Sequence, residues 1–83
     1  KLFFGGLPEE ISIQRALQYF TLANNYKPDY ILFLYGLASA QYGLGENGKA
    51  VQTLQRALSL PLSEPDDATR KERCEALLKQ IAQ

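Results

Sequence analysis

The sequence predicts an all-α fold, a helical hairpin array that ends in a C-terminal capping helix. One observation is a stretch from Ile31 to Leu60 in which two apolar stripes at helical spacing are separated by Gly43-Leu44-Gly45. Another is a set of residue types that recurs in register further along the chain. The third is a final segment that has one narrow apolar stripe and is charged elsewhere. At a length of 83 residues, we expect these helices to form a single domain, residues 1–83.

The stretch from Ile31 to Leu60 is expected to fold as an antiparallel hairpin with helices at residues 30–42 and 48–59. Ala38 and Ala50 are small enough to let the two backbones approach closely. The first helix is apolar nearly all round, so it must be covered on most sides. We expect Asp29 to cap the first helix and Asn47 to cap the second, because both side chains can accept hydrogen bonds from free backbone amides.

A repeat of residue types links this hairpin to the segment before it. Ala16, Phe20 and Ala23 each lie 34 residues before their counterparts Ala50, Leu54 and Ala57. This order of small, large and small residues, followed by Pro28, resembles the second helix of a tetratricopeptide repeat (TPR), whose period of about 34 residues equals that interval. The resemblance implies the second helix of an incomplete repeat in residues 8–28, a complete repeat in 30–61 and a capping helix in 66–82.

The last helix follows a connection longer than a standard turn between repeats, and Ser63 or Asp66 is expected to cap it. Leu78 stands where a first TPR helix has a small residue. We therefore interpret this helix as the solvating cap of a repeat array, with a further repeat as the alternative. Its apolar stripe consists of Cys74, Leu77, Leu78 and Ile81.

Three basic residues of the last helix, Arg70, Lys71 and Arg73, alternate with acidic residues. This alternation indicates a solvated helix face with i, i+4 pairs. The whole chain has nine basic and nine acidic residues and thus no net charge, so no nucleic-acid partner is expected.

The first seven residues, KLFFGGL, precede a helix that we expect to run from Pro8 to about Asn25, because proline and the acidic residues after it suit a first turn. Leu2, Phe3 and Phe4 allow three interpretations. They are the remainder of a missing first helix that packs on the hairpin, they form a docking or self-association strand that could join two copies into a homodimer, or they are disordered. The chain begins with Lys1 and contains no methionine, so we expect it to be a piece of a longer protein.

Several classes of function are not expected from this composition. The chain has no histidine, and its single cysteine, Cys74, lies on an apolar stripe without a neighbour that would make it reactive. No run of about 20 apolar residues is present, so we expect no membrane segment in this chain. No phosphate-binding loop is recognisable among the glycines. We therefore expect no enzyme activity, no metal site and no cofactor.

The TPR resemblance implies a concave face lined by first helices. The positions that would line this face carry mostly apolar and tyrosine side chains, which suit a peptide or a helix with apolar anchors. We therefore predict a scaffold that binds a protein or peptide partner on this face. The alternatives are burial of this face against other parts of the protein, a small-molecule or lipid ligand, and a structural segment that closes a longer array without a ligand. No side chain at these positions is positive, which argues against the carboxylate clamp of chaperone-binding family members. The positions are Leu32, Tyr35, Gly36, Ser39 and Tyr42.

Overall fold

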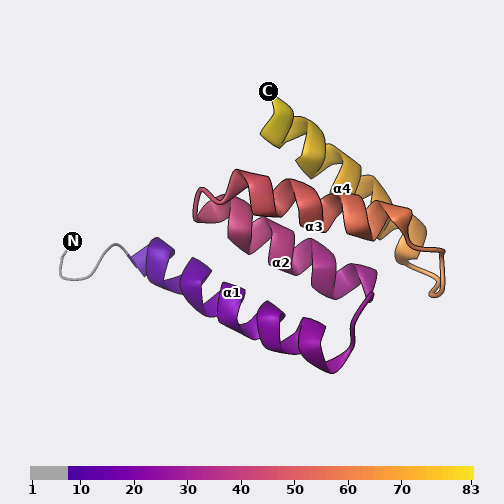
Figure 1. Cartoon of the computed structure of the whole chain (residues 1–83), viewed down its shortest axis with the longest axis horizontal. Helices are drawn as coiled ribbons and strands as arrows, with labels where there is room; N and C mark the ends of the chain where they lie inside the picture. Colours follow the sequence, from indigo (N-terminus) through magenta and orange to yellow (C-terminus); the bar gives the residue numbers. More distant parts are fainter. Residues whose placement is uncertain (1–7) are drawn as a thin grey trace.

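A computed structural model describes residues 8–83 as four α-helices, with no strand in that range (Figure 1). The all-α prediction is confirmed, and each helix end lies within one residue of its expected position. Leu2, Phe3 and Phe4 lie outside the described residues, so the predictions made for them stay predictions. The helices are α1 (Pro8–Tyr26), α2 (Ile31–Gly43), α3 (Asn47–Ser59) and α4 (Asp67–Ala82).

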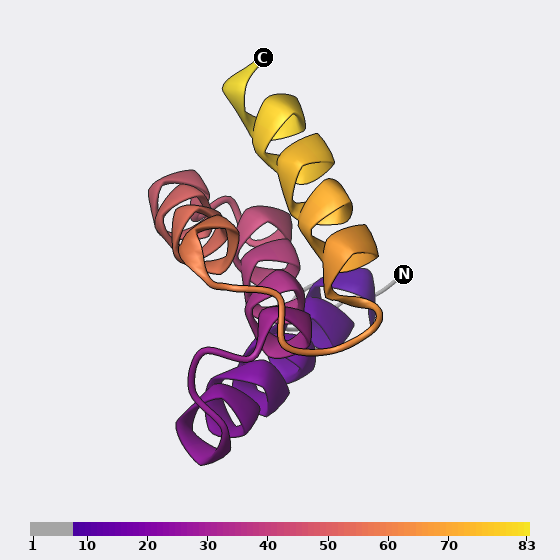
Figure 2. The same cartoon turned by 90° about the vertical axis from the view of Figure 1, so that its right-hand side faces the viewer.

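Helix α2 is the centre of the arrangement, because it contacts each of the other three helices. Helix α1 lies on one side of it, while α3 and α4 lie on the other (Figure 1, Figure 2). Helix α3 contacts both α2 and α4, whereas α1 contacts α2 alone among the helices of residues 8–83. The apolar surface of α2 explains this arrangement, since a helix of that kind is stable only when neighbours cover it.

The buried core lies between α2, α3 and α4, and the predicted stripe of the last helix is the face that α4 packs on it. By contrast, α1 carries four of the six large apolar side chains that are exposed in residues 8–83: Ile11, Tyr19, Leu22 and Tyr26. The core consists of Ile31, Leu34 and Ala38 from α2, Leu54 and Ala57 from α3, and Cys74 from α4.

The side-chain caps predicted for α2 and α3 are wrong. Asp29 has a φ of 62°, in the left-handed region that aspartate tolerates, and its carboxylate pairs with Arg56 at 2.7 Å instead of binding α2 amides. Asn47 is the first residue of α3 itself, and neither it nor Glu46 before it caps the helix with a side chain. Both helix starts therefore depend on tertiary packing more than on local capping.

The turn between α2 and α3 reverses the chain tightly. Gly45 has a φ of 82°, which a residue with a side chain rarely adopts, and its N–H donates to the Tyr42 carbonyl at 3.0 Å. The reversal brings the two helices of the hairpin side by side. The Thr53 hydroxyl on α3 then donates to Gln41 Oε1 on α2 at 2.8 Å.

The close packing of α2 on α3 can be tested at Ala38 and Ala50, which have no exposed surface. Ala38→Leu and Ala50→Leu are each expected to lower the free energy of unfolding by about 1 to 3 kcal/mol, because the larger side chain must displace packed neighbours. Ala76→Leu makes the same change on the exposed surface of α4 and should alter this free energy by less than about 0.5 kcal/mol. Urea denaturation measures all three, and unchanged midpoints at both buried positions would contradict the packing.

Candidate functional site

A hollow of about 450 Å³ opens along α1 and α2, and we call it the α1–α2 hollow. It contains four of the five residues that the sequence predicts for a concave face; Tyr42 is the exception. One residue of α4 reaches it from the other side of α2. The lining consists of Ile13, Ala16 and Phe20 from α1, Leu32, Tyr35, Gly36, Ser39 and Ala40 from α2, and Arg73 from α4.

Gly36 sets the distance between α1 and α2 at the floor of the hollow. A Cβ atom at this position would lie 2.4 Å from the ring of Phe20, so the ring lies directly against the α2 backbone. Ser39, one turn further on, donates its hydroxyl to the Tyr35 carbonyl oxygen at 2.9 Å. Small residues along this side of α2 therefore leave space above the helix, while Tyr35 forms part of the wall.

Tyr42 lies at the C-terminal end of α2, outside the lining of the hollow. Its hydroxyl accepts a hydrogen bond from Gln80 Nε2 of α4 at 3.4 Å. This contact links the end of α2 to the end of α4, and a contribution of Tyr42 to partner binding stays a prediction.

Arg73 brings a positive charge to the hollow that the sequence did not reveal. The α2 positions predicted for the concave face carry no positive charge, whereas this guanidinium comes from α4. Arg73 makes no ion pair within residues 8–83, in contrast to Arg70 on the preceding turn. Together with Leu32 it also lines an adjoining depression of about 300 Å³ at the start of α4. Only the packing of α4 across α2 places Arg73 there, and helical spacing does not contain that information.

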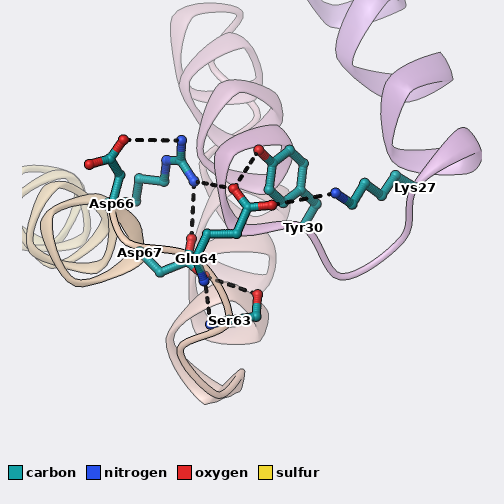
Figure 3. A network of polar contacts seen from close by, with 7 residues as sticks. Lys27, Tyr30, Ser63, Glu64, Asp66 and Asp67 are labelled. Carbon is teal, nitrogen blue, oxygen red and sulfur yellow. Dashed lines mark hydrogen bonds and ion pairs between the residues drawn. The ribbon is translucent and has the colours of Figure 1, made fainter.

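A network of polar contacts holds the start of α4 against the start of α2 (Figure 3). Glu64 is at its centre: it accepts hydrogen bonds from the Tyr30 hydroxyl at 3.0 Å and from Arg70 Nη1 at 3.3 Å, and it pairs with Lys27 Nζ at 3.6 Å. The hydrogen bond from Tyr30 is the main cause that lowers the pKa of Glu64. The network joins the α1–α2 turn to the α3–α4 loop and so determines where Arg73 lies.

Asp67, the first residue of α4, binds the loop that precedes it. Its buried Oδ2 accepts hydrogen bonds from the N–H groups of Ser63 at 2.9 Å and Glu64 at 3.0 Å, and Arg70 Nη1 donates to Oδ1 at 3.2 Å. The Ser63 amide is the largest cause that lowers the pKa of Asp67, and burial partly offsets it. The prediction that Ser63 or Asp66 caps α4 is therefore wrong: Asp66 precedes the helix without a side-chain cap, and Asp67 accepts from the loop instead.

Arg70 and Lys71 do not lie on a solvated face, contrary to the prediction for the basic residues of this helix. The Arg70 side chain is only 15% exposed and lies between the carboxylates of Glu64 and Asp67. Lys71 Nζ donates to the carbonyl oxygens of Leu58 and Leu60 at the end of α3. Of the three basic residues in this segment, Arg73 alone is exposed.

Residues 8–83 show no reactive thiol, no grouped metal ligands and no membrane-spanning helix. Burial raises the pKa of the Cys74 thiol to about 11, so the thiol is protonated at neutral pH. Between residues 8 and 83, no three acidic, histidine or cysteine side chains are grouped as a metal ion would require. None of the helices in this range has the length and apolar character needed to cross a membrane.

The role of Asp67 predicts a pH dependence. The pKa of Asp67 in the folded chain lies below its ordinary value of 3.8, so its carboxylate stabilises the fold fully above that value, and this stabilisation is lost as the pH falls through the lower folded pKa. Asp67→Asn should lower the Tm by about 5 °C or more at neutral pH. The difference from wild type should shrink at roughly pH 4 and below.

The matched control for this measurement is Asp66→Asn, which removes the same charge from a side chain that is 80% exposed. It should change the Tm by less than about 2 °C. A difference between wild type and Asp67→Asn that is constant over the whole pH range would contradict the assigned role of the Asp67 carboxylate.

Comparison with known proteins places the chain in a family. No curated protein and no solved structure shows a significant match to it. A family model described as "Regulator of microtubule dynamics protein 1-3" matches residues 1–82, which is nearly the whole chain. The chain therefore belongs to the family of regulator of microtubule dynamics proteins 1–3.

Proposed function

We propose that the chain is a TPR-type interaction scaffold whose α1–α2 hollow binds a peptide or a helix of a protein partner. The observation that carries this proposal is the hollow itself, in which Leu32, Tyr35, Gly36 and Ser39 line one space of about 450 Å³. Eight of its nine lining residues are uncharged, so burying an apolar side chain of a partner there would be favourable. The resemblance to TPR hairpins supports the same face.

The chemistry of the lining favours a polypeptide ligand. Tyr35 presents a rigid ring with few rotamers to lose, and Leu32, which is 38% exposed, adds apolar area beside it. The hollow follows two helices and continues past Leu32 into the adjoining depression, so it offers an elongated surface. A helix or peptide with several apolar side chains matches such a surface better than a compact small molecule does.

The family description suggests which proteins to consider as partners. The matching family is described as regulators of microtubule dynamics. We propose that the partner belongs to the microtubule machinery and that this domain brings it to the rest of the protein without catalysing a reaction. The net charge of zero gives no support for binding through electrostatic attraction alone.

A second candidate function is purely structural: the chain closes a longer helical array and has no ligand of its own. The outer face of α4 favours it, because Glu72, Glu75 and Lys79 are exposed and no further helix covers them in residues 8–83. In this case residues 8–28, 30–61 and 66–82 are the end of a repeat series. The two candidates differ in whether the hollow is accessible to another protein.

Site-specific crosslinking tests the first candidate. A photo-reactive amino acid at Leu32, in the hollow, should capture a partner from cell extract that the same group at Leu62 does not capture; Leu62 is 60% exposed and lies outside the hollow. With the captured protein purified, Leu32→Ala should weaken binding by about 1 kcal/mol or more, and Leu62→Ala by less than about 0.5 kcal/mol. The absence of any adduct specific to position 32 would contradict partner binding in the hollow and favour the structural role.

A further inference from the structure

Ser63 lies in the loop between α3 and α4, and its side chain is exposed. Residues 61–63 are neither helix nor strand, and the backbone is already extended at Leu60, where ψ is 149°. Leu62, next to the serine, is 60% exposed. An exposed, irregular segment of this kind can enter the active site of a modifying enzyme without the unfolding of a helix.

The Ser63 hydroxyl is the weakest of the contacts that hold this loop. It donates to Asp67 Oδ2 at 3.1 Å, which is longer than the usual O–H···O distance of about 2.7 to 2.8 Å (Figure 3). The same carboxylate oxygen accepts from the N–H groups of Ser63 at 2.9 Å and Glu64 at 3.0 Å. The hydroxyl can therefore leave Asp67 more readily than the backbone amides can.

Acidic residues follow Ser63 at three of the next four positions, namely Glu64, Asp66 and Asp67. Asp66 is 80% exposed, and its ion pair with Arg70 is 3.9 Å long. An enzyme with a basic substrate groove can therefore pair with Asp66 while the domain stays folded. The other exposed serines of residues 8–83 have no acidic residue among the four that follow them; they are Ser12 and Ser59.

We propose that Ser63 is a phosphorylation site for a serine/threonine kinase that recognises acidic residues after the serine, and that its phosphate releases the start of α4. The kinase transfers the γ-phosphoryl group of ATP. The bond from Ser63 Oγ to phosphorus forms, the bond from the γ-phosphorus to the oxygen that bridges to the β-phosphate breaks, and ADP leaves with its electron pair. A carboxylate of the kinase takes the hydroxyl proton.

The charge of Asp67 explains why a phosphate would release the loop. Phosphoserine has no hydroxyl hydrogen to donate and carries a charge of about −1.5 to −2 at neutral pH. Asp67 has no exposed surface and is itself negatively charged, since its pKa lies below the ordinary value. A phosphate on an oxygen 3.1 Å from that carboxylate repels it, and the burial of Asp67 leaves the repulsion poorly screened.

The two basic side chains of the polar network are already paired. Arg70 is only 15% exposed between Glu64 and Asp67, and Lys27 pairs with Glu64 at 3.6 Å. Because Asp66 adds a third carboxylate, these two cations face three acidic side chains. A phosphate on the serine therefore adds to an existing excess of negative charge at this loop.

Loss of the Asp67 contacts would loosen the first turn of α4. Asp67 is the first residue of this helix, and the backbone hydrogen bond from Arg70 N–H to the Asp66 carbonyl oxygen, 3.0 Å long, lies in the same turn. Phosphorylation of Ser63 thus acts on the packing of α4. This inference goes beyond the proposed function and does not depend on partner binding in the α1–α2 hollow.

Phosphorylation of the full chain tests the recognition. The chain is incubated with ATP and a purified serine/threonine kinase that requires acidic residues after its target, and mass spectrometry locates the phosphate. Ser63 should be modified, whereas Ser59, an exposed serine followed by apolar residues, should not be. Asp66→Asn should lower the initial rate about tenfold, because one charge-assisted contact to the kinase is lost. Glu75→Gln removes the same charge from an exposed position elsewhere on α4 and should leave the rate as it is.

Thermal unfolding tests the release of α4. The phosphorylated chain should have a Tm that is lower by about 5 °C or more than that of the unmodified chain. Ser63→Ala removes only the hydroxyl and should lower the Tm by less than about 2 °C. In Asp67→Asn, a neutral side chain lies beside the phosphate, so phosphorylation should lower the Tm of this variant by less than about 2 °C.

Four results would overturn the inference. If the kinase modifies a synthetic peptide of residues 58–70 but not the folded chain, the loop does not present Ser63. If it modifies neither, or if Asp66→Asn is modified as fast as wild type, the acidic residues are not recognition elements. If the phosphorylated chain has an unchanged or higher Tm, the phosphate does not release α4.

Discussion

The coverage of α2 is the constraint on which the rest of this structure depends. Helix α2 is apolar nearly all round, and it remains stable because α1, α3 and α4 all pack against it. Ile31 and Leu34 are almost fully buried in these contacts, and each such side chain contributes about 1.5 to 3 kcal/mol. Three neighbours do not cover the whole helix. The side of α2 that carries Leu32, Tyr35 and Ser39 stays open, and it forms the α1–α2 hollow.

The second constraint is the position of α4, to which polar contacts contribute beside its apolar stripe. Glu64 and Asp67 hold Arg70, and Asp67 also holds the loop that leads into the helix. Since Arg73 is one turn beyond Arg70, this arrangement also decides that a positive charge reaches the hollow. The carboxylates of Glu64 and Asp67 pair with Arg70, which leaves Arg73 as the unpaired arginine of this segment.

Periodicity was sufficient to predict the helices, because helix faces follow directly from spacing. Four of the five positions that the TPR resemblance implies for a concave face are among the nine residues that line the hollow. The errors occurred where tertiary contacts compete with local ones. Asp29 pairs with Arg56 and so does not cap α2. At the start of α4, Asp67 is a buried acceptor for the preceding loop, and neither Ser63 nor Asp66 caps the helix as expected. The location of Arg73 depends on how α4 crosses α2, and no pattern within one helix contains that information.

The central claim is that the uncovered side of α2 is the surface on which this domain binds a partner. Amide chemical-shift mapping by NMR, with the partner purified after crosslinking at Leu32 added to the labelled chain, tests it most directly. The account predicts the largest shifts at Ala16, Gly36 and Ser39, which line the hollow. Large shifts at Leu22 and Tyr26 on the exposed surface of α1, with none at Gly36, would contradict it.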